Sequence, residues 1–115
     1  MGAGRMKIPE SVRIGGVEYE IQYVDHLSNG NVLAYGHICW DDSVIELSGT
    51  EGTSHQKRCC TLWHEIIHGV VEHANLDIPN SDEESIVDTI AKGVYQVLQD
   101  NGGRFFDIVS DPDAP

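Results

Sequence analysis

The chain has 115 residues, 40% of them hydrophobic and 23% charged, which suits one domain with a core of its own. Nineteen acidic residues against seven Lys and Arg give a net charge of -12, which argues against binding to nucleic-acid phosphates. The sequence has neither an apolar run long enough to span a bilayer nor a signal-peptide pattern, so we expect no membrane association.

The first half of the chain is predicted to form strands. Residues 1–7 are expected to be a disordered lead, and a single domain is expected over 8–109. Hydrophobic residues alternate with polar ones on both sides of Gly15-Gly16, which predicts a β-hairpin. Its arms are 12–14 and 17–23. Further strands are expected at 32–40 and 43–47, and together they predict a small, mainly antiparallel sheet.

A turn-rich connection, 48–54, leads into a helix that either Thr53 or Ser54 can cap. Apolar side chains recur there at helical spacing and predict one buried face. This face consists of Cys59, Leu62, Trp63, Ile66, Ile67, Val70, Val71 and Ala74.

The same helix contains an HExxH motif, formed by His64, Glu65 and His68. Residues four apart lie about one helical turn from each other, so the two imidazoles can bind one Zn²⁺. Glu65 would lie beside the metal, where a carboxylate can take a proton from an attacking water molecule. The motif predicts a zinc peptidase centre with Glu65 as its general base.

A catalytic zinc ion usually has a third protein ligand. His73 follows His68 by five residues and would point away from the His64–His68 pair on a continuing helix, so we interpret it as a histidine near the helix end. The second helical pattern, Ser81–Leu98, offers Glu84 instead. Glu84 could alternatively close a capping box with Ser81, in which case the neighbouring Glu83 is the next candidate ligand.

The second helix is predicted to bury an apolar face through which it packs on the first. This face consists of Ile86, Val87, Ile90, Val94, Val97 and Leu98. Glu84, Asp88 and Tyr95 follow one edge of it. Asp88 is a candidate to orient a ligand imidazole, and Tyr95 a weaker candidate to stabilise an oxyanion; both residue types are also common on ordinary helix surfaces.

The HExxH helix followed by Glu84-Ser-Ile-Val-Asp88 resembles the gluzincins, and the small size of the chain is most similar to ImmA/IrrE-like and phage-encoded metallopeptidases. The resemblance covers about residues 31–101 and implies a zincin-like α+β fold. It implies His64, His68 and Glu84 as zinc ligands, Glu65 as general base and Asp88 as a residue that supports a ligand. It also implies that an edge strand, either 35–40 or 43–47, holds an extended peptide substrate.

The leading hypothesis is therefore a zinc-dependent endopeptidase whose substrate is a protein or peptide. The resemblance to ImmA/IrrE-like peptidases implies that this substrate is a regulatory protein. The alternatives are a non-catalytic zinc-binding interaction or regulatory module, and a protein in which the motif binds no metal. Three cysteines give no disulfide framework, which favours a reducing cytoplasm. Residues 104–109 are expected to pack on the body, and 110–115 to form a disordered acidic tail.

Overall fold

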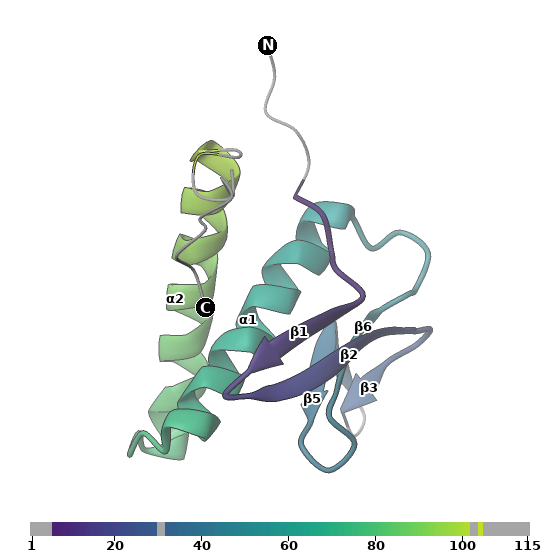
Figure 1. Cartoon of the computed structure of the whole chain (residues 1–115). Helices are drawn as coiled ribbons and strands as arrows, with labels where there is room; N and C mark the ends of the chain where they lie inside the picture. Colours follow the sequence, from purple (N-terminus) through teal and green to yellow (C-terminus); the bar gives the residue numbers. More distant parts are fainter. Residues whose placement is uncertain (1–5, 30–31, 102–103, 105–115) are drawn as a thin grey trace, which may run out of the picture.

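The computed structural model describes residues 6–29, 32–101 and 104 (Figure 1). The expected tail at 110–115 lies outside these residues, as do residues 1–5 of the expected lead 1–7 and residues 105–109 of the segment expected to pack on the body. The strands are β1 (Ser11–Ile14), β2 (Val17–Val24), β3 (Ser28–Asn29), β4 (Val32–Leu33), β5 (Gly36–Cys39) and β6 (Val44–Ser48). The helices are α1 (His55–Ala74) and α2 (Asn80–Asn101).

The main sheet has four strands in the order β1-β2-β6-β5, and α1 crosses one of its faces (Figure 1). Strands β1 and β2 pair antiparallel, as do β5 and β6, but the central pair β2–β6 is parallel, with Ile21 opposite Ile45. The α+β class is confirmed. Two of the three strand pairs are antiparallel, in line with the mainly antiparallel sheet expected, but the parallel pair that makes the sheet mixed was not predicted, because alternation along a strand does not show which strand lies beside it.

The hairpin is confirmed: Gly15 and Gly16 both have positive φ, 57° and 81°, which suits a two-residue turn between β1 and β2. The single strand expected at 32–40 is wrong. Its first part, β4, pairs with β3 in a separate two-stranded ribbon, and only β5 joins the main sheet. Backbone hydrogen bonds from Ala34 to Leu27 and from Ser48 to Tyr35 hold the chain where it passes between the two sheets.

The core lies between the sheet and α1. Ile45 and Leu47 of the central strand β6 are completely buried there, since alternate residues of a strand point to the same face. The other buried members of this cluster are Ile14, Tyr19, Ile21, Ile38 and Leu62. Gly69 lets α1 approach closely, because a Cβ at that position would lie 2.9 Å from Ile14 Cδ1.

Helix α1 begins after Ser54, whose hydroxyl accepts a hydrogen bond from the Lys57 amide at 3.0 Å. This settles the choice between the two possible caps. The helix ends at Asn75, which has the left-handed conformation common at helix C-termini. Two members of the predicted apolar face, Val70 and Ala74, are exposed, Val70 by 46%, so their predicted burial is wrong.

Helix α2 contacts α1 and, within the described part of the chain, none of the strands. Val87 and Ala91 are buried in this interface. Ile86, Ile90 and Val97 are 41%, 47% and 51% exposed, so their predicted burial is wrong. One neighbouring helix can cover only a narrow stripe of α2, and that stripe lies toward the edge carrying Asp88 and Ala91. Neither described helix is long and apolar enough to cross a membrane.

Candidate metal centre

The two histidines of α1 meet Glu84 of α2 at the helix–helix interface. His64 Nε2 lies 2.7 Å from Glu84 Oε1, and His68 Nε2 lies 3.0 Å from Glu84 Oε2. The two Nε2 atoms are 3.2 Å apart. The predicted His₂Glu group is therefore brought together, by one helical turn of α1 and the first turns of α2.

Two further carboxylates contact the outer nitrogens of the same imidazoles. His68 Nδ1 lies 2.8 Å from Glu83 Oε2, and His64 Nδ1 lies 3.3 Å from Asp88 Oδ1. Glu83 and Glu84 thus have different places, since Glu84 lies against both Nε2 atoms and Glu83 against one Nδ1. The sequence predicted the position of Asp88 but missed the orienting position of Glu83, whose only signal was its place next to Glu84.

This donor set fits a Zn²⁺ ion. Tetrahedral zinc with bonds of about 2.0–2.1 Å holds two nitrogen ligands about 3.3 Å apart, close to the 3.2 Å between the Nε2 atoms. At that distance one Nε2–H can donate a hydrogen bond to the other Nε2, or two nitrogen lone pairs can share a cation. The carboxylates at the Nδ1 atoms would keep the protons there and leave both Nε2 atoms free to bind metal.

Glu65 lies close to β5, since a Cβ on Gly36 would be 3.5 Å from its Cγ, and it is only 7% exposed. Burial raises the pKa of its carboxyl group, and the nearby Glu84 raises it further, while His64 and His68 act in the opposite direction. A raised pKa makes a carboxylate a stronger proton acceptor. The structure therefore places a carboxyl group suited to proton transfer beside the histidine pair.

Asp88 has a second partner on the side away from the histidines. Its Oδ2 lies 2.8 Å from Lys92 Nζ, one helical turn further along α2. The hydrogen bond from Lys92 is the main cause that lowers the pKa of Asp88, and the contact with His64 adds to it. Asp88 is thus kept ionised as an acceptor for the imidazole of His64.

A cleft of about 290 Å³ opens beside these groups. Its lining includes His64, Glu65 and Glu84, together with Tyr35 and Gly36 at the start of β5. Strand β5 is an edge of the main sheet, whereas β6 is paired on both sides. Of the two segments expected to offer an edge, 43–47 is therefore wrong and 35–40 contains the edge strand.

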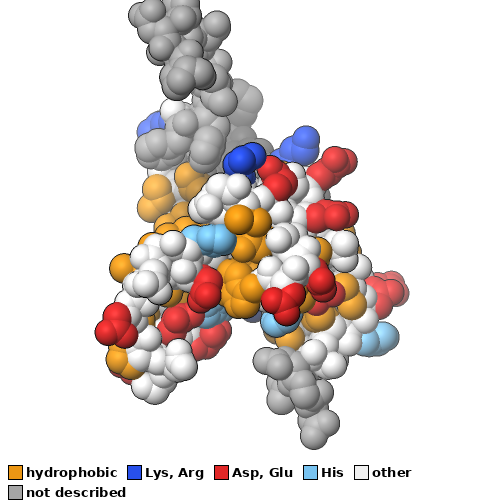
Figure 2. Space-filling model, turned by 60° about the horizontal axis from the view of Figure 1, so that its bottom comes forward, with side chains coloured by type: hydrophobic (Ala, Val, Ile, Leu, Met, Phe, Trp, Pro, Cys, Tyr) orange, Lys and Arg blue, Asp and Glu red, His pale blue; other side chains and the backbone are white. Residues whose placement is uncertain are grey.

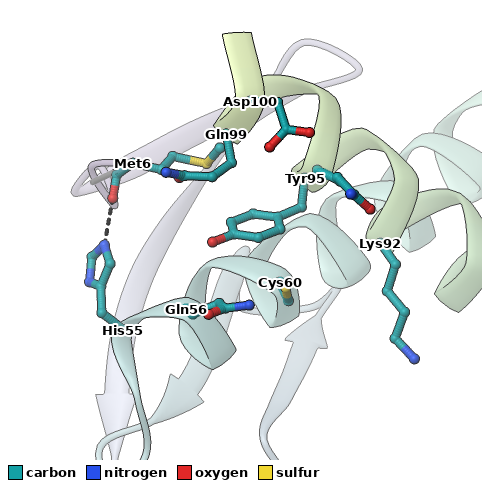
Figure 3. Close-up of a pocket in the computed structure, with 9 residues that line it drawn as sticks. Met6, His55, Gln56, Cys60, Lys92, Tyr95, Gln99 and Asp100 are labelled. Atoms are coloured by element: carbon teal, nitrogen blue, oxygen red, sulfur yellow. Dashed lines mark hydrogen bonds between the residues drawn. The ribbon is translucent and has the colours of Figure 1, made fainter. Parts of the chain in front are cut away.

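A larger hollow of about 720 Å³ lies further along the groove between α1 and α2 (Figure 3). Tyr95 points into it from α2, opposite Gln56 and Cys60 of α1. Tyr95 does not line the cleft beside the histidines, so its predicted role at an oxyanion is not supported by its position. Cys60 and Lys92 line both spaces, which makes the two hollows neighbours in one groove.

His73 lies away from the metal centre, as expected, and packs against the sheet. Its Nε2 is 2.7 Å from the hydroxyl of Tyr19, and its ring contacts those of Tyr19 and Trp40 edge to face. A Cβ on Gly15 would collide with this ring. His73 therefore helps to hold the β1–β2 turn against the last turn of α1.

Acidic side chains are spread over the face shown in Figure 2, whereas the Lys and Arg side chains visible there lie toward one border of it. This agrees with the net charge of -12 and favours cationic ligands over anionic ones. In comparisons with known proteins, no protein-family model, curated protein or solved structure matches the chain.

Proposed function

We propose that the chain is a small zinc-dependent endopeptidase of the gluzincin type, similar to the ImmA/IrrE-like and phage-encoded metallopeptidases. One observation carries the proposal: His64, His68 and Glu84 converge through their metal-binding atoms, next to a buried Glu65. Orienting carboxylates on both imidazoles support it, because zinc-binding histidines usually donate their second ring N–H to such a group.

In this proposal His64, His68 and Glu84 hold the metal, and Asp88 and Glu83 fix the ring orientation of the two histidines. Bound Zn²⁺ would supply a Lewis acid that polarises the scissile carbonyl group and the attacking water. Glu65 accepts a proton from that water and donates it to the departing amine, which its raised pKa favours. Its burial against the sheet keeps the carboxyl group aimed into the cleft.

The substrate is proposed to be an extended segment of a protein, paired with the backbone of edge strand β5 beside the cleft. The acidic surface favours a segment with basic residues. A regulatory protein in a reducing cytoplasm suits the resemblance and the odd number of cysteines in the chain, three.

The first test is the zinc content of the purified protein, measured by elemental analysis. We expect His64→Ala to lower the zinc content by about one per chain, Glu84→Ala to lower it by less, and Glu65→Gln to leave it unchanged. Glu83→Gln is the matched control, because it keeps Glu84 and should lower affinity by about 10–100-fold rather than abolish binding. A wild-type chain that takes up no zinc when it is supplied would contradict the proposal.

The second test is cleavage of a mixture of unstructured proteins by the zinc-loaded chain, with products identified by mass spectrometry. Glu65→Gln should retain zinc and lose cleavage. The small cleft and a Glu84 side chain that is 70% exposed also favour a second candidate, a zinc-binding module without catalysis. Zinc binding with no cleavage of any substrate, and biological activity kept in Glu65→Gln, would select that candidate.

A further inference from the structure

A second cluster of metal-binding side chains lies on the outer face of the sheet, the one opposite α1. His37 and Cys39 are two residues apart on β5, so both point to the same face, and His37 is paired in register with Glu46 of β6. Their neighbours Ile38 and Ile45 point the other way, into the core. The sheet register itself therefore brings an imidazole, a thiol and a carboxylate together.

The contacts within this cluster are close. Cys39 Sγ lies 3.2 Å from His37 Nδ1 and 3.8 Å from Glu46 Oε1, and His37 Nδ1 lies 3.8 Å from the same oxygen. Around tetrahedral zinc, with bonds of about 2.3 Å to sulfur and about 2.0–2.1 Å to nitrogen or oxygen, such donors lie about 3.4–3.6 Å apart. Shifts of a few tenths of an ångström would bring all three onto one ion.

We propose that His37, Cys39 and Glu46 form a second site for Zn²⁺, separate from the His64–His68 centre. A thiolate and an imidazole together favour zinc over calcium or magnesium, which prefer oxygen ligands. The exposed side of the cluster leaves a fourth position for water, since the His37 side chain is 56% exposed. This inference does not depend on the proposed peptidase activity.

The charge around the cluster suits a cation. Burial and the negative charges of Glu46, Asp42 and Asp41 raise the pKa of the Cys39 thiol. A bound cation would stabilise the thiolate form of Cys39 and would itself be stabilised by these carboxylates. The ion would join β5 to β6 and thereby hold the edge strand whose first residue, Gly36, lines the catalytic cleft.

The test is a titration of the reduced, metal-free, full-length protein with Co²⁺. A cysteine ligand gives a thiolate-to-cobalt absorption band in the near ultraviolet, which the His₂Glu centre cannot give. We expect this band in the wild type and in His64→Ala, so loss of the first centre leaves the second intact. One equivalent of Zn²⁺ per site should displace the cobalt and remove the band.

Cys39→Ser should abolish the band and weaken cobalt binding at this site by at least about tenfold. Even the loss of a residue that only supports a metal ligand typically lowers affinity by about that factor. Cys60→Ser is the matched control, because Cys60 lines the cleft of the first centre and should leave the band unchanged. His37→Ala gives a second variant that keeps all three cysteines. A band that is absent, or that disappears with Cys60→Ser and persists in Cys39→Ser, would overturn the proposal.

Discussion

The approach of β5 to α1 depends on the absence of a side chain at Gly36, and Gly36→Ala should show this directly. A Cβ there would collide with the Thr61 methyl group and lie 3.2 Å from the Glu46 carbonyl oxygen and 3.5 Å from Glu65 Cγ. Overpacking of this kind costs about 1–3 kcal/mol. For a domain of this size that corresponds to a fall of about 4–12 °C in the melting temperature.

Thr61→Ser is the compensating change. It removes the colliding methyl group but retains the hydroxyl, which donates a hydrogen bond to the Lys57 carbonyl oxygen at 2.7 Å. Alone it should cost about 1 kcal/mol, for one buried methyl group and the space left behind. In the double variant the added methyl group at position 36 occupies that space, so the two costs should not add.

Chemical denaturation of the wild type, both single variants and the double variant measures this coupling. We expect the double variant to be more stable than the sum of the single effects predicts by at least about 1 kcal/mol. Gly93→Ala is the control for the glycine change itself, because nothing lies within 4 Å of its Cβ position in α2 and it should stabilise by about 0.5–1 kcal/mol. Additivity within about 0.5 kcal/mol would refute the steric argument.

Three other predictions concern charged and polar side chains. The raised pKa of Glu65 means that folding disfavours its ionised form. The resulting loss of folding stability is absent below the pKa of the unfolded chain and grows as the pH rises through the pKa of the folded chain. In metal-free protein, Glu65→Gln should therefore become more stable relative to wild type as denaturation is repeated from pH 4 toward pH 8, and a constant difference would contradict this. Lys92→Met removes an exposed contact with Asp88 and should change the stability of the fold by no more than about 0.5 kcal/mol, while the Asp88 pKa measured by NMR rises; no rise would contradict the assigned cause. Tyr19→Phe leaves His73 without its hydroxyl partner and should cost about 1 kcal/mol in thermal unfolding, whereas an unchanged melting temperature would show that water replaces the contact.

The candidate site was largely predictable because it depends on helical spacing. His64 and His68 share a flank of α1 at any crossing angle, and Glu84 and Asp88 are one turn apart on α2 in the same way. What the spacing could not give was which acid faces which nitrogen. That depends on how α2 is rotated against α1, and the rotation places Glu83 at Nδ1 of His68.

The predictions about the fold that were wrong concern contacts between residues distant in sequence. The apolar residues Ile86, Ile90 and Val97 have helical spacing, but with α1 as its single neighbour α2 leaves them exposed. The parallel pairing of β2 with β6 joins segments separated by β3, β4 and β5, which no local pattern reports. The hairpin at Gly15-Gly16 was predicted correctly because its turn and both its strands are contiguous in the sequence.

Among the described elements α2 contacts only α1, so the interface between these two helices alone positions the α2 carboxylates that lie against His64 and His68. Opening of that interface separates Glu84 from both histidines while the sheet and α1 keep their shared core. If the centre binds Zn²⁺ as proposed, loss of the ion would favour local detachment of α2. Amide hydrogen exchange is then expected to be fast in metal-free α2 and slow in β6, and zinc should slow the exchange of α2 toward that of β6.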